Sequence, residues 1–229
     1  QNARQVLLRG ARDLDAAGRL ESAAIVRAAA EAHADGILRL PEAMTTDEVR
    51  GVEGLAAQAY FGAFDHLVTA GRTEFRFGGR SRRPPLDRAN CLISFLYSLW
   101  TNDCVSALES VGLDPQFGYL HVLRPGRPAL ALDLVEEFRS VVLDRLALSL
   151  INRRQVVADD FDVREGGAVM LTDDGRKKVL QAYMKRKTLE VPHALFVERV
   201  PIGLLPHVQA RLLARCLRGD LEVYIPYAP

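Results

Sequence analysis

The chain is poor in cysteine, with only three in 229 residues: Cys91, Cys104 and Cys216. They are widely spaced and form no CxxC motif, which argues against a disulfide framework and a zinc ribbon and favours a reducing, cytoplasmic compartment. No run of about eighteen apolar residues is present, so no membrane span or membrane partner is expected. The chain starts at Gln1 without a signal-peptide pattern, directly in helix-like sequence. We therefore expect it to be a fragment that lacks an N-terminal part.

Several motifs of common enzyme classes are also missing. Without HExxH the sequence does not support a zincin, and without a Walker loop or GxGxxG it does not support a nucleotide-binding fold. The formal net charge of +1 says little about partners by itself. Its distribution is more informative, because arginine is concentrated over 72–88 and lysine and arginine over 176–187. A nearly neutral protein with two basic segments can bind a polyanion locally.

The hydrophobic pattern is mostly helical and predicts one mainly α-helical domain covering 1–229. Thr45 and Glu48 form a capping box that should open a helix ending near Ala70. The Gly166-Gly167 pair indicates a β-hairpin, to which the strand signal is confined. Helices are expected over 3–34 with a break near Gly18, 45–70, 87–112, 129–154, 172–187 (capped by Thr172 or Asp173) and 201–218, and the hairpin over 161–175.

The segment from Tyr119 to Arg139 carries the most informative residues. His121 is followed by a loop of proline, glycine and arginine, and then by an apolar helix. Asp133 and Glu136 stand three positions apart on that helix, so their carboxylates project from the same side. Carboxylates among apolar residues cost free energy to desolvate without a partner. A cation is the simplest partner, and an imidazole over the same turn would complete a hard-ligand metal site.

Glu53 is a third acidic candidate, in the apolar helical stretch GVEGLAAQAYF, with no base four residues later. Each candidate also has an ordinary interpretation. Glu53 could face solvent, and His121 could be a hydrogen-bonded histidine without a metal. The two helix carboxylates could instead form ion pairs with Arg127 or Arg139. The residue pattern alone leaves these alternatives open.

Four longer segments resemble a known family: GVEGLAAQAYF, RSRRPPLDRANCLISFLYSLW, ALESVGLDPQFGYLHVLRPGRPALALDLVEEFR and LLPHVQARLLARCLRGDLEVYIPY. They resemble the CRISPR spacer-acquisition integrase of bacterial type I-like systems, the catalytic subunit of the adaptation complex. The resemblance covers nearly the whole chain. It implies that the chain is the family's C-terminal helical domain, without the small N-terminal β-domain that builds the homodimer. It further implies double-stranded DNA, the prespacer and the CRISPR leader–repeat, as substrate, and a small ferredoxin-like dimer as partner.

The resemblance also implies a metal site, whose ligands fall on Glu53, His121 and Glu136. The family's additional acid, one turn earlier, falls on Asp133, and all four residues are implied to be catalytic. Which of Asp133 and Glu136 touches the ion is open. Two carboxylates and one imidazole suit Mg²⁺ or Mn²⁺ better than soft-ligand metals. The implied reaction is attack of a prespacer 3′-hydroxyl on a phosphodiester of the array.

Basic and aromatic residues near these segments are expected to contact DNA. Tyr97 matches an aromatic residue near the family's site and is expected to position DNA. As a nucleophile it lacks a recognisable arginine and histidine constellation. The other expected contacts are Arg80, Arg82 and Arg83 in the proline-containing loop, Arg124 and Arg127 beside the metal loop, and Lys177, Lys178, Lys185 and Arg186 on the basic helix. Two rival functions remain, a stand-alone metal-dependent DNase and a non-catalytic helical subunit that binds nucleic acid.

Overall fold

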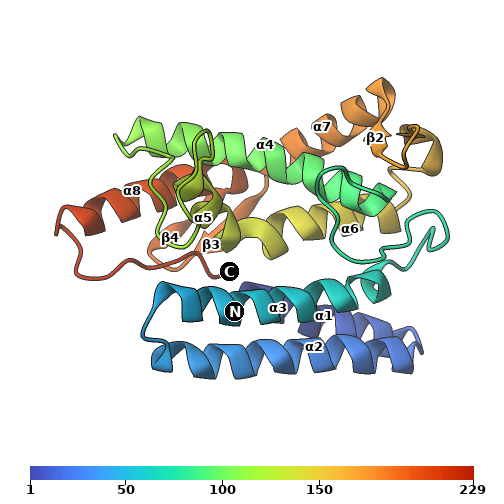
Figure 1. Cartoon of the computed structure of the whole chain (residues 1–229), viewed down its shortest axis with the longest axis horizontal. Helices are drawn as coiled ribbons and strands as arrows, with labels where there is room; N and C mark the ends of the chain where they lie inside the picture. The colour runs from blue at the N-terminus through green and yellow to red at the C-terminus, as the bar shows by residue number, and fades with distance from the viewer.

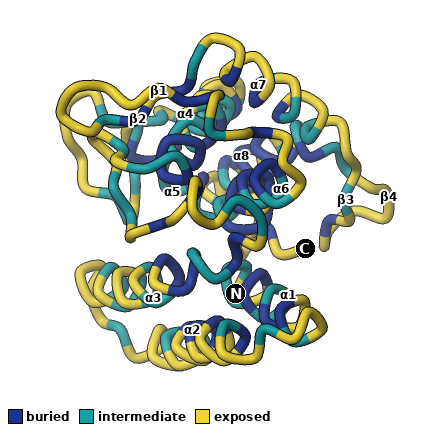
Figure 2. The backbone as a smooth tube through the Cα atoms, turned by 90° about the vertical axis from the view of Figure 1, so that its right-hand side faces the viewer, coloured by how far each residue is buried: buried dark blue, intermediate teal, exposed yellow.

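Three N-terminal helices form one layer of the molecule (Figure 1). The computed structural model describes all 229 residues. Helix α1 spans Asn2–Ala16, α2 spans Leu20–Arg39 and α3 spans Thr46–Leu67. The predicted break between the first two helices is confirmed at Gly18, whose φ of 73° is a conformation that glycine adopts without steric cost. In Figure 2, α1 and α3 lie on opposite sides of this layer, with α2 beneath them.

The start of α3 is fixed by the predicted capping box. Thr45 Oγ1 accepts the Glu48 N–H at 3.2 Å, and the Glu48 carboxylate accepts the Thr45 N–H at 3.2 Å. The helix ends at Leu67, shortly before the expected Ala70. Asn152 of the other layer accepts the Thr69 N–H at 2.8 Å and thereby fixes the chain just after the helix. This anchoring sets the position of α3, which carries Glu53.

The second layer contains the longest stretches of buried apolar residues. Its helices are α4 (Arg88–Ser110), α5 (Ala129–Phe138), α6 (Arg145–Asn152), α7 (Asp173–Lys187) and α8 (Leu205–Leu217). Leu92, Leu96 and Trp100 follow one another at four-residue spacing on α4 and are fully buried. The Trp100 ring packs edge-on against Phe138 at 5.4 Å between ring centroids. This packing ties α4 to α5, the helix that carries Asp133 and Glu136.

The predicted helix over 129–154 is helical to Asn152 but is not uniform. A π-helical turn at Arg139–Asp144 separates α5 from α6. Such turns have a wider hydrogen-bond spacing and are frequent at functional sites. Here the turn begins directly after the acidic residues of α5 and contains Arg139 and Asp144, which both lie beside the candidate site.

Short strands complete the fold, and one prediction about them is wrong. The expected hairpin is confirmed as β1 (Phe161–Val163) paired antiparallel with β2 (Val169–Leu171). A second hairpin, β3 (Glu190–His193) with β4 (Phe196–Pro201), was not expected. Most of its residues are exposed and it contains prolines, so no alternation of apolar and polar residues marks it. The mainly α-helical class is confirmed, since strands occur only in these two pairs.

Single helical turns of the 3₁₀ type occur at Leu40–Glu42, Ala158–Asp160 and Ile202–Leu204. The last of these delays the final helix from the predicted Pro201 to Leu205. The two chain ends meet between the layers, where the Asn2 side-chain amide donates to the Tyr227 carbonyl at 2.9 Å. Every helix of the fold is too short or too polar to cross a bilayer.

Candidate active site

The most ordered part of the site is the contact between Asp133 and the segment that contains His121. Asp133 Oδ2 accepts the N–H groups of Tyr119 at 2.6 Å and Leu120 at 3.0 Å. Asp133 Oδ1 accepts the His121 N–H at 2.9 Å and lies 2.7 Å from His121 Nδ1. One carboxylate therefore fixes both the backbone of the segment and the imidazole ring.

The electrostatics of Asp133 agree with this arrangement. Burial alone would raise its pKa, but the hydrogen bonds from the His121 side chain and from three backbone N–H groups lower the pKa below its ordinary value. Gly118 is required for the close approach, because a Cβ there would lie 2.8 Å from the backbone of Ala129 and 2.9 Å from Asp133 Oδ2. The segment thus packs directly on the first turn of α5.

Glu136 lies one turn after Asp133 and has a different partner. Its carboxylate pairs with Arg139 Nη1 at 2.7 Å. Burial raises the pKa of Glu136, the charge of Arg139 opposes this rise, and the charge of Glu53 adds to it. Of the two arginine pairings considered from the sequence, the one with Arg139 is therefore confirmed for Glu136.

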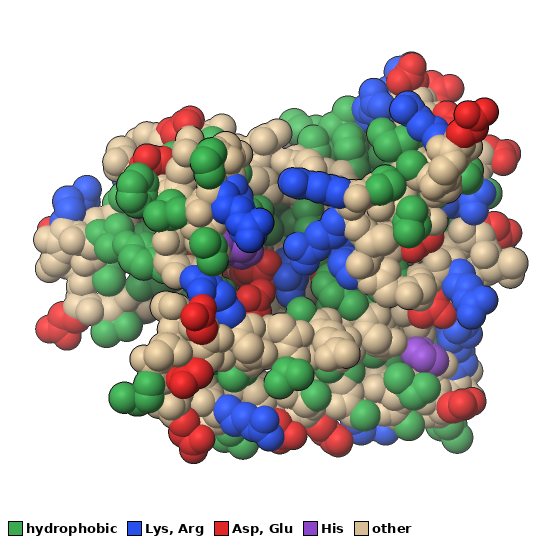
Figure 3. All heavy atoms as spheres, viewed as in Figure 1, with side chains coloured by type: hydrophobic (Ala, Val, Ile, Leu, Met, Phe, Trp, Pro, Cys, Tyr) green, Lys and Arg blue, Asp and Glu red, His purple; other side chains and the backbone are tan.

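Glu53 on α3 faces the same region from the other layer. The charge of Glu53 raises the pKa of Glu136 and that of His121 lowers it, so both groups lie within electrostatic reach of Glu136. Figure 3 shows acidic side chains gathered beside a histidine in a hollow, with lysine or arginine side chains around them. The fold therefore places Glu53 within electrostatic reach of Glu136, although the two residues lie far apart in the sequence.

The side chains do not converge as closely as metal ligands do. No group of three or more His, Cys, Asp and Glu side chains has metal-binding geometry. Glu136 is turned toward Arg139, and His121 uses Nδ1 for Asp133. The chemistry of the donors still fits a hard divalent cation, because two carboxylates and one imidazole nitrogen, Nε2, are left for it.

A buried carboxylate, Asp144, lies within electrostatic reach of Arg139. Asp144 is completely buried, and its Oδ1 accepts the Tyr97 hydroxyl at 2.6 Å. Burial raises the pKa of Asp144, and the charge of Arg139 works against that rise. The pKa of Tyr97 is also raised, first by burial and then by the charge of Asp144. The Tyr97 hydroxyl is thus held inside the protein, while the DNA contact expected for this residue remains a prediction.

Arg80, one of the expected DNA contacts, also makes hydrogen bonds within the protein. Its Nη1 donates to Asn90 Oδ1 at 2.8 Å and to Ser94 Oγ at 3.1 Å. Its guanidinium also lies over the Tyr97 ring, 5.4 Å from the centroid. These contacts hold the arginine-rich loop on α4. Arg80 Nη1 is therefore used within the protein, whereas Nε has no hydrogen-bond partner. The DNA contact expected for Arg80 remains a prediction.

The other arginines of the two loops remain candidates for DNA contact. Arg82, Arg83 and Arg124 are exposed, and Arg127 is half-buried.

Most of the basic residues of α7 expected to contact DNA already have partners within the protein. Lys177 pairs with Asp174, Lys178 with Asp160, and Arg186 Nη2 lies 3.5 Å from the Val141 carbonyl, whereas Lys185 is exposed without an ion pair.

Sequence reasoning missed two residues of the site, Asp144 and Arg50. Asp144 was detectable as the single acid in the apolar run SVVLDRLAL. Arg50 Nε donates to the Leu120 carbonyl and so ties α3 to the segment of His121. No pattern in the sequence indicates this contact, because it joins residues 70 positions apart.

Comparison with known proteins gives a family match over most of the chain. The family model for CRISPR associated protein Cas1 matches residues 1–185. A CRISPR-associated endonuclease Cas1 of Moorella thermoacetica is 52% identical over 227 residues, covering 99% of this chain and 65% of the relative. One from Chlorobaculum tepidum is 58% identical over 191 residues, covering 83% and 56%. The chain thus spans less than two thirds of either relative.

Solved structures agree with this match. A casposase bound to integration product has a TM-score of 0.76 at 26% identity, covering 97% of this chain and 61% of the casposase chain. A Cas1 protein from Thermotoga maritima has a TM-score of 0.71 at 30% identity, covering 96% and 68%.

Proposed function

Because this chain belongs to the Cas1 family of CRISPR-associated proteins, we propose that it is the catalytic part of a metal-dependent DNA endonuclease and integrase. Its substrates are a short duplex, the prespacer, and the leader–repeat junction of a CRISPR array. The 3′-hydroxyl of the prespacer attacks a phosphodiester, a new P–O bond forms, and the former 3′-oxygen leaves with a proton. The similarity to a casposase bound to integration product supports joining rather than cleavage alone.

One observation carries the proposal. Asp133 anchors His121 at 2.7 Å, and Glu136 lies within electrostatic reach of both His121 and Glu53. A carboxylate that binds one imidazole nitrogen leaves the other nitrogen oriented as a ligand, which is common around protein-bound metals. This supports a division of labour in which Asp133 positions His121 and Glu136 is the direct ligand.

Glu53, Glu136 and Nε2 of His121 would hold Mg²⁺ or Mn²⁺. The bound ion would lower the pKa of an attacking hydroxyl and offset charge on the phosphate. Asp133, as acceptor of an Nδ1 proton, keeps the Nε2 lone pair free. Arg124 and Arg127 lie on the loop that follows His121 and are placed to hold phosphate oxygens.

A strand-transfer assay with Mn²⁺ and a branched DNA tests this function. We expect Glu136→Gln and His121→Ala to lower joining by at least about a hundredfold, since each removes a ligand. Matched controls are Glu109→Gln and His207→Ala, which change exposed residues outside the site and should leave joining unchanged. Electron paramagnetic resonance of Mn²⁺ with the same variants gives a second readout that does not depend on turnover.

The possible outcomes separate the rival functions. Cleavage without joining would favour a stand-alone DNase. Joining and Mn²⁺ binding that survive both site substitutions would refute the metal site. DNA binding with neither activity nor Mn²⁺ binding would favour a non-catalytic subunit. The homodimer and the small ferredoxin-like partner stay predictions of the family resemblance, for which light scattering with the purified partner is the test.

A further inference from the structure

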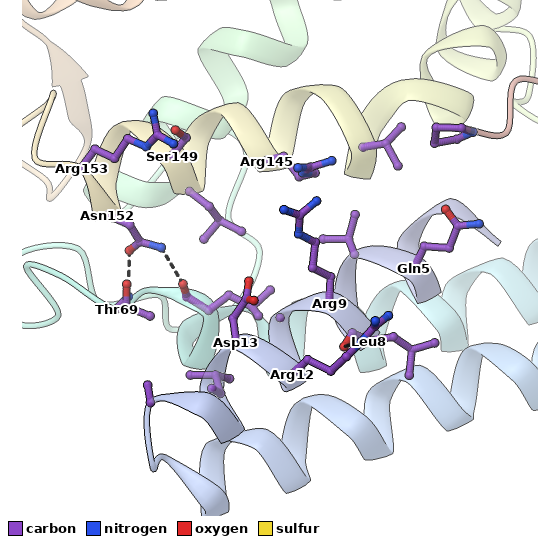
Figure 4. A pocket seen from close by; sticks show the side chains of 18 residues that line it. Gln5, Leu8, Arg9, Arg12, Asp13, Thr69, Arg145, Ser149, Asn152 and Arg153 are labelled. Atoms are coloured by element: carbon purple, nitrogen blue, oxygen red, sulfur yellow. Dashed lines mark hydrogen bonds between the residues drawn. The ribbon is translucent and has the colours of Figure 1, made fainter. Parts of the chain in front are cut away.

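A second hollow lies between the two layers, away from the candidate metal site. It is a groove of about 870 Å³, walled by α1 on one side and by the π-helical turn and α6 on the other (Figure 4). The end of α3 closes it at Leu67 and Thr69. Asn152 fixes this end, because its side chain donates to the Leu67 carbonyl at 2.9 Å and accepts the Thr69 N–H. The groove is therefore a stable feature of the fold.

Positive charge dominates the lining of this groove. It contains four arginines, Arg9, Arg12, Arg145 and Arg153, and a single acid, Asp13. None of the four arginines forms a salt bridge, in contrast to several basic residues elsewhere in the chain. The lining thus carries a net charge of about +3 at neutral pH, counted from these five side chains. The protein itself does not neutralise this charge.

The arginines come from both walls of the groove. Arg9 and Arg12 are three residues apart on α1 and so lie on one side of that helix. Arg145 is the first residue of α6, and Arg153 follows its last residue. Figure 4 shows Arg9 and Arg145 pointing toward one another across the groove. Their proximity is reflected in Arg145, whose pKa is lowered first by burial and then by the charge of Arg9. The charge of Arg145 also lowers the pKa of Arg186, after burial, and the buried Nε of Arg186 has no hydrogen-bond partner.

We propose that this groove binds the phosphate backbone of a DNA segment, at a site separate from the metal site. Facing guanidinium groups without acidic partners are suited to phosphate oxygens, which they contact in pairs. Figure 2 shows α3, which carries Glu53, and α1, which carries Arg9 and Arg12, on opposite sides of the N-terminal layer.

The length of the groove favours a nucleic acid over a small anion. Its α1 wall runs from Gln5 to Ala17, which at 1.5 Å per residue is about 18 Å. A DNA strand carries one phosphate per about 3.4 Å of helix axis, so several phosphates fit along this wall. Because integration as proposed above joins two DNA segments, a second backbone site has a use. The biological use of the groove therefore rests on the proposed function, whereas the prediction that the groove binds DNA does not.

Neutralising the two facing arginines tests the proposal. The variant is Arg9→Gln with Arg145→Gln, and the matched control is Arg211→Gln with Arg215→Gln, two exposed arginines of α8 without ion pairs. Both double variants lower the net charge equally. The measurement is fluorescence anisotropy of a labelled 30-bp duplex, about 30 bp being long enough to extend past the groove, in EDTA over a series of NaCl concentrations.

We expect the groove variant to bind the duplex about tenfold more weakly at moderate salt, with the slope of log K against log salt reduced by about 2. The control should change affinity less than about twofold. Thermal unfolding should show that the groove variant is folded, since the substitutions remove a repulsion. Should it not fold, Arg12→Gln with Arg153→Gln takes its place.

Affinity and slope equal to those of the control would overturn the proposal. A second experiment tests whether the groove binds a small anion instead of DNA. If pyrophosphate raises the unfolding temperature of the wild type but not of the groove variant, and both bind the duplex equally, the proposal is also overturned. A changed oligomeric state in light scattering with unchanged DNA binding would overturn it as well, and would indicate a protein partner. Because the assay contains no metal, weaker binding by the groove variant supports the groove even if Glu136→Gln leaves strand transfer intact.

Discussion

Replacing Asp133 by asparagine should loosen the segment that holds His121. The two oxygens of Asp133 accept four hydrogen bonds, three from backbone N–H groups and one from the imidazole. Asparagine keeps one oxygen and turns the other into an NH₂ group, which cannot accept. One or two of the backbone N–H groups of Tyr119, Leu120 and His121 would then lose their acceptor, depending on which oxygen is kept.

The size of the effect follows from these contacts. A buried donor left without a partner costs about 1–3 kcal/mol, and hydrogen bonds to a charged acceptor lie at the upper end of the usual range. The Asp133 side chain is 14% exposed, so water replaces little of what is lost. We expect Asp133→Asn to lower the free energy of unfolding by about 2–4 kcal/mol, a large part of the total for an ordinary domain.

Urea unfolding measures this loss, and the same loop offers a matched control. Asp114→Asn makes the same charge change, but Asp114 is exposed and accepts one backbone hydrogen bond, from Gln116 at 2.8 Å. Its cost should stay below about 1 kcal/mol. Amide hydrogen exchange should accelerate at Tyr119, Leu120 and His121 in Asp133→Asn, and Mn²⁺ affinity should fall about 10- to 100-fold.

The stabilisation by Asp133 in the wild-type protein depends on pH with a defined sign. Burial opposes ionisation of Asp133, but the hydrogen bonds prevail and its folded-state pKa is lowered. The unfolded chain therefore binds this proton more tightly, and the stabilisation is complete above the unfolded pKa of about 4. It is lost as the pH falls through the lower folded pKa. Equal urea midpoints for wild type, Asp133→Asn and Asp114→Asn at pH 7 would refute the reasoning.

Two further substitutions test the surroundings of the site. Tyr97→Phe removes the 2.6 Å hydrogen bond from the Tyr97 hydroxyl to the fully buried Asp144 and should cost about 2 kcal/mol in urea unfolding. Unchanged stability would contradict this role. Gly118→Ala would place a Cβ 2.8 Å from the α5 backbone and 2.9 Å from Asp133 Oδ2, and should lower stability by about 1–3 kcal/mol in thermal unfolding. Gly54→Ala is its control, because a Cβ there meets nothing within 4 Å.

The features that the sequence predicted well depend on local interactions. The capping box of Thr45 and Glu48 forms as expected, and Thr172 caps α7 by accepting the Gly175 N–H at 3.0 Å. Each involves residues three positions apart, so their spacing alone determines the contact. The unexpected hairpin at Glu190–Pro201 lacks such a signal, since its strands are short and mostly exposed. Its pairing depends on tertiary structure.

The roles of the basic residues also depend on tertiary contacts that the sequence does not reveal. A run of lysine and arginine on α7 predicts a DNA-tracking helix, but Lys178 pairs with Asp160, which lies on another element 18 residues earlier. Arg80 Nη1 likewise donates to Asn90 and Ser94 of α4. In contrast, no sequence pattern marks Arg9 and Arg145, because they are far apart in the chain and each is typical of a solvated surface residue. A run of charged residues in the sequence therefore predicts an exposed surface. Which of those residues lack an ion-pair partner is known only from the folded structure.

The choice between Asp133 and Glu136 was open from the sequence, because residues three apart on a helix project from the same side. Counting acceptor sites separates them. A carboxylate offers about four lone-pair positions, and Asp133 already uses four hydrogen bonds to a fixed backbone segment and ring. Glu136 has a single partner, the long side chain of Arg139. Moving one arginine side chain would free Glu136, whereas freeing Asp133 would require moving a backbone segment. We therefore propose Glu136 as the carboxylate that binds a metal, and Asp133 as the residue that positions His121.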